Sequence, residues 1–210
     1  MIRIGLSGGI GTGKTTVLAM FKKLGITTLS ADAVVSAELK SNRRLKAKIR
    51  RAFGPGVFRK GAVDKRALAQ AAFSGAKDVK KLNALVHPLV KTRIFEFFRK
   101  HKKGSRKALA VVEVPLLFET GFDRFFDTTV VVSATSRVQK ERFSQRPRFG
   151  PEDFRRRLRW QLPLAEKRMR CDFVIDNNGD RRKTFDQVKK IVDFLIGGSS
   201  KEEKTWKRKK

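Results

Sequence analysis

The sequence predicts an α/β fold in which a parallel five-stranded sheet is covered by helices on both faces. Three observations support this class. Short, dense apolar segments alternate along the chain with longer segments of helical periodicity. Two of the apolar segments, 108–114 and 128–132, are rich in β-branched residues, as strands buried on both faces require. A glycine-rich turn joins the first strand to the first helix, which suits a site at the carboxyl ends of the strands.

Apolar spacing and terminating residues indicate where each strand and helix begins and ends. The expected strands are 2–6, 26–29, 108–114, 128–132 and 172–176. The first helix starts at Lys14 and ends at Gly25, and the second begins near Asp32. Residues 40–103 predict a helical insertion in which His87-Pro88 separates two helical stretches. A basic helical stretch, 135–170, is interrupted by proline and glycine, and a helix at 184–196 closes the fold.

Length and composition predict one domain at 1–196, with the insertion at about 40–103, a lid at about 137–170 and a disordered basic tail at 197–210. The single cysteine, Cys171, fits a reducing compartment, and we expect it to be a small buried apolar side chain. No signal peptide is evident, because residues 1–6 enter a strand directly and lack a long apolar region. No membrane span is expected, because the most apolar stretch, 108–118, is short and is broken by Glu113 and Pro115. We expect a soluble, cytoplasmic protein with no membrane partner, either a monomer or a small homo-oligomer.

Charge is the unusual feature of the composition. Fifty Lys and Arg against 20 Asp and Glu give a formal charge of +30, which attracts any polyanion. The excess is spread over the chain: residues 40–66 hold 11 basic residues and one acid, and residues 137–170 hold 12 against four. No recognition helix, zinc finger or RNA-binding aromatic signature accompanies it. The charge therefore predicts, at most, weak and non-specific nucleic-acid binding.

The glycine-rich turn carries the chemistry. It reads Gly8-Gly9-Ile10-Gly11-Thr12-Gly13-Lys14-Thr15, matches the P-loop pattern G-x-x-x-x-G-K-[ST] and continues with Thr16. Its glycines let backbone N–H groups point at phosphates, and the helix that follows adds its N-terminal partial charge. Lys14 can then reach the β- and γ-phosphates, and the Thr15 hydroxyl can bind Mg²⁺. Residues 8–16 thus predict an ATP site; the alternative is a chance glycine-rich turn.

Two acids follow strands. Asp32 comes just after the strand 26–29, which we expect to neighbour the P-loop strand, so its carboxylate can orient and deprotonate an acceptor hydroxyl. The alternative for Asp32 is a helix N-cap. Glu113 ends a hydrophobic strand and suggests a role near Mg²⁺, directly or through water. The alternative is a polar cap on that strand, with Glu119 a solvated loop acid.

Arg142 and Arg146 are four residues apart, on one face of a predicted helix. Proline and glycine nearby predict a movable lid, from which arginines can stabilise charge on a transferring phosphoryl group. The alternative is a solvated basic face. His87, taken by itself, is a structural residue or a helix-end cation. Two histidines and one cysteine argue against a structural zinc site.

Nearly the whole chain, up to about residue 196, resembles the dephospho-coenzyme A kinase family. A P-loop alone is widely shared, whereas Pro-Leu-Leu-Phe-Glu and His-Pro, in this order and spacing, are far more specific. The matching positions are 5–16, 31–32, 85–90, 113–119 and 176–179, with Gln139, Arg142, Arg146 and Gln161.

The resemblance implies a three-layer P-loop NTPase fold like that of adenylate kinase, with a helical region for the coenzyme and a small lid. It implies transfer of the ATP γ-phosphate to the ribose 3′-hydroxyl of dephospho-coenzyme A, with Mg²⁺. Asp32 falls at the family's catalytic carboxylate, and Arg142 and Arg146 fall in the lid. The resemblance assigns Asn177 and Asn178 to the adenine, and His87, Glu113, Pro115 and Leu116 to the acceptor region.

One departure is Ser30, where the family commonly has the first acid of Asp-Ala-Asp; Asp32 is the acid that the chemistry needs, and it is present. Two other functions were weighed. A P-loop kinase for another small acceptor, such as a nucleoside monophosphate or shikimate, is not expected to share the segments at 85–90 and 113–119. A basic nucleic-acid-binding protein with a regulatory or vestigial P-loop is supported only by the charge and the basic tail.

Overall fold

The computed structural model describes residues 1–101, 109–145, 154–155 and 158–197, and the chain divides into two compact units. The sheet unit comprises Met1–Leu29 and Phe98–Lys210, and the helical unit comprises Ser30–Phe97. The middle of the expected lid, including Arg146, and the expected disordered tail from residue 198 lie outside the described residues. Every helix in the described ranges is too short or too polar to cross a membrane.

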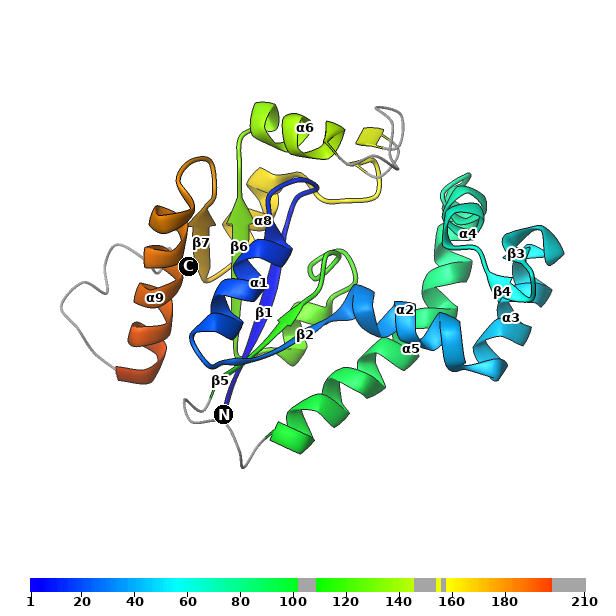
Figure 1. The fold of residues 1–210 in the computed structure, drawn as a ribbon, viewed down its shortest axis with the longest axis horizontal. Coiled ribbons are helices and arrows are strands. Elements are labelled where there is room, and N and C mark those ends of the chain that lie inside the picture. Colours follow the sequence, from blue (N-terminus) through cyan, green and yellow to red (C-terminus); the bar gives the residue numbers. More distant parts are fainter. Residues whose placement is uncertain (102–108, 146–153, 156–157, 198–210) are drawn as a thin grey trace. The chain divides into compact units, whose positions relative to one another are not determined.

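The sheet unit is built on a five-stranded sheet with the strand order β2-β5-β1-β6-β7 (Figure 1). The strands are β1 (Ile2–Gly8), β2 (Thr27–Ser30), β5 (Leu109–Glu113), β6 (Thr128–Ser133) and β7 (Phe173–Asp176). β1 pairs in parallel with both β5 and β6, and β6 pairs in parallel with β7. All residues of β5 and β6 are buried, as their β-branched composition predicted. The predicted α/β class with a parallel five-stranded sheet is confirmed.

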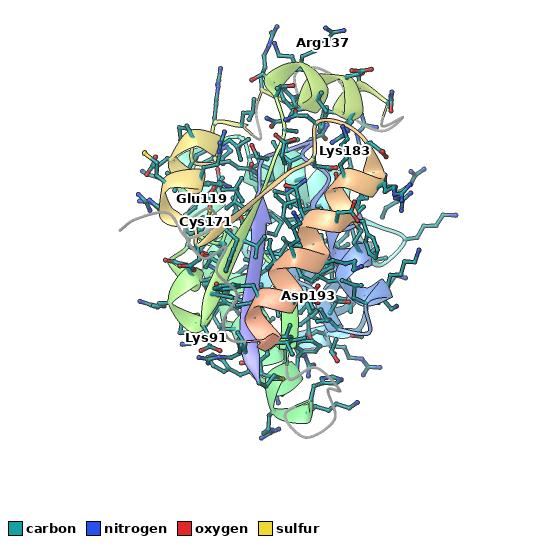
Figure 2. The ribbon with its side chains drawn as sticks, turned by 90° about the vertical axis from the view of Figure 1, so that its left-hand side faces the viewer. Lys91, Glu119, Arg137, Cys171, Lys183 and Asp193 are labelled. Carbon is teal, nitrogen blue, oxygen red and sulfur yellow. The ribbon has the colours of Figure 1, made fainter. Side chains whose placement is uncertain are left out.

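Helices lie on both sides of this sheet. α1 (Lys14–Lys23) and α9 (Arg181–Gly197) pack against each other, and their apolar side chains form one core with β1, β5, β6 and β7. α8 (Leu164–Arg170) contacts β6 on the opposite side from α9 (Figure 2). α6 (Ser136–Ser144) follows β6, and a 3-10 helix, η2 (Phe122–Phe125), lies between β5 and β6. Cys171 is buried, as expected.

The helical unit contains the expected insertion. Its elements are α2 (Ala31–Ser41), α3 (Arg43–Phe53), a 3-10 helix η1 (Pro55–Val57), the antiparallel pair β3 (Phe58–Arg59) and β4 (Ala62–Val63), α4 (Lys65–Ala72) and most of α5 (Ala76–His101). Local chemistry defines the helix starts: Asn42 accepts a hydrogen bond from Leu45 N at α3, and Asp64 accepts from Arg66 N at α4. The unit has its own apolar core, centred on Leu45, Ile49 and Leu68.

Two expectations about this framework are wrong. β2 does not neighbour the P-loop strand, because β5 lies between β2 and β1. Chain order alone suggested adjacency, but the strand that follows the helical insertion takes the central place. His87-Pro88 does not separate two helices, because α5 is continuous and contains Pro88. A proline removes one helical hydrogen bond, and here the carbonyl that loses its donor belongs to Ala84, an exposed residue that water can reach.

Candidate active site

The P-loop between β1 and α1 is shaped by close contact with its neighbours. Gly11 and Gly13 have φ angles of 75° and 88°, in the left-handed region that favours glycine. A Cβ on Gly11 would lie 2.4 Å from the backbone oxygen of Gln139, and one on Gly13 would lie 2.2 Å from Asn177 Nδ2. Both positions therefore need glycine for conformation and for space.

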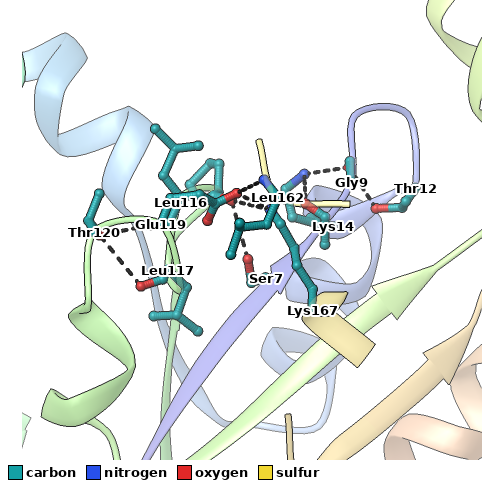
Figure 3. A network of polar contacts seen from close by, with 12 residues as sticks. Ser7, Gly9, Thr12, Lys14, Leu116, Leu117, Glu119, Thr120, Leu162 and Lys167 are labelled. Carbon is teal, nitrogen blue, oxygen red and sulfur yellow. Dashed lines mark hydrogen bonds and ion pairs between the residues drawn. The ribbon is translucent and has the colours of Figure 1, made fainter. Parts of the chain in front are cut away.

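Hydrogen bonds within the loop hold this shape. Thr12 Oγ1 donates to Gly9 O at 2.9 Å, and Lys14 Nζ donates to Gly9 O at 2.8 Å and to Gly8 O at 3.3 Å (Figure 3). α1 begins at Lys14 with no side-chain cap at Gly13 and no acid in its first turn. The N–H groups and partial positive charge of the helix start are thus left to an anion, as in phosphate sites.

Two buried amide side chains brace the loop from outside. Asn177 Nδ2 donates to Thr12 O at 2.7 Å, and Asn177 Oδ1 accepts from Thr184 Oγ1 at 3.0 Å. Gln139 Nε2 donates to Ala134 O at 2.8 Å, which fixes the α6 residue whose backbone lies against Gly11. Sequence reasoning gave neither residue this role. The sequence signal that could have identified them is a polar residue next to strand or helix positions that are otherwise apolar.

Asn178 lies beside this brace with a different set of partners. Its Oδ1 accepts from Thr135 N at 2.6 Å, and its amide nitrogen donates to Asp176. Thr135 is the N-cap of α6 and accepts in turn from Val138 N. Asn178 therefore holds the start of α6, while its neighbour Asn177 holds the P-loop.

Glu113 and Thr15 meet at the carboxyl end of the sheet. Glu113 is the last residue of β5 and is only 4% exposed, and Thr15 Oγ1 donates to its Oε1 at 3.4 Å. The pairing follows from strand order, since β5 lies directly beside the P-loop strand. No group of three or more His, Cys, Asp or Glu suited to a metal occurs among the described residues. A hydroxyl and one carboxylate nevertheless fit Mg²⁺, which takes few protein ligands and completes its shell with phosphate and water.

Arg142 lies in the last turn of α6, against the start of α1. Its Nη1 is buried and has no hydrogen-bond partner among the described residues, and a Cβ on Gly13 would lie 3.6 Å from it. Arg142 is thus only partly exposed, with one guanidinium nitrogen turned away from solvent. Arg137, by contrast, points away from the sheet on the outer side of α6 (Figure 2). The predicted partner of Arg142 on that face, Arg146, is outside the described residues.

Glu119 is not the solvated loop acid that was considered as an alternative. Its side chain is 12% exposed, and its Oε1 lies 2.7 Å from the Nζ of Lys167, a lysine with no exposed surface. The same oxygen accepts from Leu162 N at 2.9 Å. Sequence reasoning missed Lys167, because one lysine among fifty basic residues carries no signal of burial.

Two further predicted residues, Asp32 and His87, belong to the helical unit. Asp32 is exposed in the first turn of α2, where Ser30 occupies the N-cap position, so the N-cap alternative for Asp32 is wrong. His87 is half-buried within α5, and this burial lowers its pKa. α2 is tied to α5 by Glu38, whose Oε1 accepts from Arg93 Nε at 2.8 Å.

Comparisons with known proteins place the chain in context. A family model described as dephospho-CoA kinase matches residues 2–183. A dephospho-CoA kinase of Brucella abortus (strain 2308) is 40% identical over 200 residues, which are 95% of this chain and 96% of that protein. One of Geobacillus kaustophilus is 37% identical over 192 residues, 91% of this chain and 95% of that protein.

Solved structures agree with the fold. The Thermus thermophilus protein TT1252 superposes with a TM-score of 0.79 at 31% identity, over 95% of this chain and 98% of that one. The dephospho-CoA kinase from Campylobacter jejuni gives 0.67 at 25% identity, over 93% and 98%. A shikimate kinase from Acinetobacter baumannii gives 0.51 at 18% identity over 96% of each chain, which shows a shared fold alone.

Proposed function

The chain belongs to the dephospho-CoA kinase family, and from that premise we propose that it transfers the γ-phosphate of ATP to the ribose 3′-hydroxyl of dephospho-CoA. The enzyme is a P-loop kinase, an ATP-dependent phosphotransferase that acts in coenzyme A biosynthesis. The alternative of a shikimate kinase has only the fold in its favour. The structural observation that most supports nucleotide chemistry is Thr15 beside Glu113 at the mouth of a braced P-loop.

The phosphates of ATP bind against the P-loop in this proposal. The backbone N–H groups of residues 8–16 and the uncapped start of α1 supply donors and partial positive charge. Lys14, which donates to the carbonyls of Gly8 and Gly9, turns its ammonium to the β- and γ-phosphates. Thr15 and Glu113 would hold Mg²⁺, Glu113 directly or through water, and the ion when bound neutralises charge on the β- and γ-oxygens.

Arg142 is the group that stabilises the transferring phosphoryl charge. Its buried Nη1 has hydrogen-bonding capacity that no described residue uses, and it lies beside the helix start that receives the phosphates. A guanidinium presents several donors in one plane, which suits the three equatorial oxygens of the transferring group. Arg146, four residues further on, is proposed to act with Arg142 from the lid at about 137–170.

Asp32 is the proposed base for the acceptor. It follows the carboxyl end of β2 by two residues, and the carboxyl ends of parallel strands carry the site in sheets of this kind. It forms no hydrogen bond or ion pair with other described residues, so its carboxylate is not committed elsewhere. His87, Pro115 and Leu116 are each proposed to take part in acceptor binding, and Asn177 and Asn178 contribute to the nucleotide site through the backbone that they fix.

The first experiment measures ADP release from purified protein with ATP and Mg²⁺, with and without dephospho-CoA. We expect ADP formation that depends on the acceptor and disappears in Lys14→Ala. Shikimate and a nucleoside monophosphate serve as matched acceptors. Protein that binds ATP but shows no stimulation by dephospho-CoA would overturn the proposal.

A second measurement isolates Asp32. Asp32→Asn keeps the size of the side chain and removes the base, so kcat falls by at least ~100-fold while ATP binding stays nearly unchanged. Asp78→Asn, an exchange of the same kind elsewhere in the helical unit, is the control. Near-normal turnover in Asp32→Asn would reject its assignment as the base.

The basic surface of the helical unit supports a weak second partner, a nucleic acid. α3 contains six basic residues and no acid, and Arg44, Lys48 and Arg51 are exposed along it while Leu45 and Ile49 are buried. Because the exposed apolar residue of α3, Ala47, is too small to insert into a bilayer, this surface suits phosphodiester groups. We expect Arg44→Ala/Lys48→Ala/Arg51→Ala to reduce the salt dependence of RNA binding, and Arg182→Ala/Lys189→Ala/Lys190→Ala on α9 to reduce it less. Equal reductions would indicate a general effect of net charge.

A further inference from the structure

Lys167 is a charged residue that the fold has placed in its interior. It lies within α8, where Ala165 and Arg168 are exposed, yet Lys167 itself has no exposed surface. Its Nζ lies 2.7 Å from Glu119 Oε1 and donates to Pro115 O at 3.2 Å (Figure 3). Burial lowers the pKa of Lys167, and the Glu119 carboxylate acts in the opposite direction. An ammonium is costly to bury, so its location needs a reason.

The two partners of Lys167, Glu119 and Pro115, both lie in the loop after β5, and each of them also bonds to another part of the sheet unit. Glu119 also accepts from Leu162 N at 2.9 Å, just before α8 begins. Pro115 O also accepts from Ser7 Oγ at 3.3 Å, and Ser7 directly precedes the P-loop. Lys167 thus ties α8 to the loop after β5, and through Glu119 and Pro115 that loop is bonded in turn to the segment entering α8 and to the end of β1. The loop after β5 begins immediately beyond Glu113, whose carboxylate accepts a hydrogen bond from Thr15 Oγ1.

Stability alone is a poor explanation for this arrangement. A pair of apolar side chains of similar volume is often as stable as a buried ion pair, or more so. The Glu119 Oε2 atom is buried without a hydrogen-bond partner among the described residues, which adds a cost. What an ammonium and a carboxylate provide, and apolar side chains do not, is directional bonding to several backbone groups at once.

We propose that Lys167 and Glu119 are positioning residues for phosphoryl transfer. They hold the segment that enters α8 against the loop after β5, and so fix the position of Glu113. This inference rests on the proposed kinase function. Neither residue touches the reacting atoms, and their effect reaches the reaction through the groups that they align.

The test uses a neutral pair of the same size, Lys167→Met/Glu119→Gln. We expect the single variants to lower Tm, because each leaves a buried charge unpaired, and the double variant to recover most of that loss. We expect kcat of the double variant to stay ~10- to 100-fold below wild type, the scale on which small misplacements act, while KM for ATP changes by less than ~3-fold. Lys167→Arg, which keeps charge and donors, should retain the most activity.

The matched control is the exposed ion pair on the same helix, Arg170 with Glu166. Arg170→Met/Glu166→Gln makes the same chemical change, and we expect wild-type kcat and Tm. Wild-type kcat in the Lys167 and Glu119 double variant would overturn the proposal. So would losses of kcat that simply follow Tm across the series. If the double variant does not fold, Glu119→Asp provides the test, because it shortens the side chain and keeps both charges. An unchanged kcat in Glu119→Asp would reject the positioning role of the pair.

A fluorescence measurement separates this inference from the kinase assignment. Trp160 is half-buried and lies two residues before Leu162. In a Trp206→Phe background, Trp160 is the remaining tryptophan. We expect saturating ATP to change its emission in the otherwise wild-type protein and to change it by less than half as much in the double variant. An equal change in both would count against the pair. If the wild-type emission change occurs, falls to less than half in the double variant, and dephospho-CoA is not turned over, dephospho-CoA is rejected as the acceptor while the positioning role of Lys167 and Glu119 is supported.

Discussion

The P-loop and the α6–α8 side of the sheet unit (residues 136–145 and 158–170, with Glu119) differ in how their polar groups are satisfied. Around the P-loop, Thr12, Lys14 and Asn177 all donate to loop carbonyls. On the α6–α8 side, Glu119 Oε2, Arg142 Nη1 and Gln161 Oε1 are buried without a hydrogen-bond partner among the described residues. Since buried polar groups are usually paired, three such atoms on one side require a reason.

In the P-loop part of the site these hydrogen bonds are already formed, whereas the α6–α8 part contains hydrogen-bonding atoms that no described residue uses. A pre-shaped P-loop binds phosphate with little reorganisation, which favours affinity. The unused donor, Arg142 Nη1, gains a partner when an anion such as a phosphoryl group arrives, and an interaction made mainly in the transition state raises kcat. P-loop variants are therefore expected to affect mainly binding and stability, whereas loss of the unused Arg142 donor is expected to affect mainly turnover.

Lys14→Ala should have the largest effect, because Lys14 belongs to the P-loop and also contacts the transferring group. We expect turnover to fall by at least ~1000-fold, the scale for removing a cation from a phosphoryl-transfer site, with ATP binding weakened as well. Steady-state ADP release and nucleotide titration measure the two effects. If ATP binding were unchanged, Lys14 would behave like an α6–α8 residue and the division would need revision.

Arg142→Ala tests the other side. We expect kcat to fall ~100- to 1000-fold, as for the loss of one donor to transition-state charge, with little change in KM for ATP. Tm should not fall, because the variant removes a buried donor that forms no hydrogen bond within the described chain. Arg137→Ala, on the exposed face of the same helix, is the control. A large fall in Tm with kcat preserved would make Arg142 a structural residue and break the comparison.

Asn177→Ala should show the opposite profile. It leaves Thr12 O without its 2.7 Å donor, so we expect a loss of ~1–3 kcal/mol in the free energy of unfolding. KM for ATP should rise ~10-fold, which is ~1.4 kcal/mol of binding, while kcat at saturation falls less. Thr184→Val, which removes only the hydroxyl bonded to Asn177 Oδ1, should change both in the same direction by less. Unfolding curves and initial rates provide the test; an effect on kcat alone would contradict it.

Glu38→Gln should have the smallest effect on turnover and shows what a purely structural pair looks like. Hydrogen bonds from Asn42 and then Arg93 lower the pKa of Glu38 from its ordinary 4.5. A lowered carboxyl pKa stabilises the fold above the ordinary value, and that contribution is lost as the pH falls through the lower, folded value. We expect wild type to exceed Glu38→Gln in Tm at pH 6–8 and the difference to shrink towards pH 3. A difference that grew on acidification would have the wrong sign.

Much of the framework followed from the sequence because it depends on local patterns. The five strands, the helix starting at Lys14 and the helical insertion were recovered, since apolar period and glycine position express backbone requirements directly. Strand order was not: β5 enters the sheet between β2 and β1, which depends on how the insertion returns the chain. Pro88 was read as a break, but the packing of a long helix outweighed one missing hydrogen bond.

The class of fold, the phosphate-binding loop and the family follow from the sequence, because these depend on residue type at fixed spacing. Which charges are buried, and what they contact, follows from the folded structure alone. Lys167 and the exposed lysines read alike in the chain, and Asn177 resembles any loop asparagine. The physical reason is that burial and pairing arise from residues far apart in sequence: Asn177 lies 165 positions from the carbonyl it holds, and Lys167 lies 52 from Pro115.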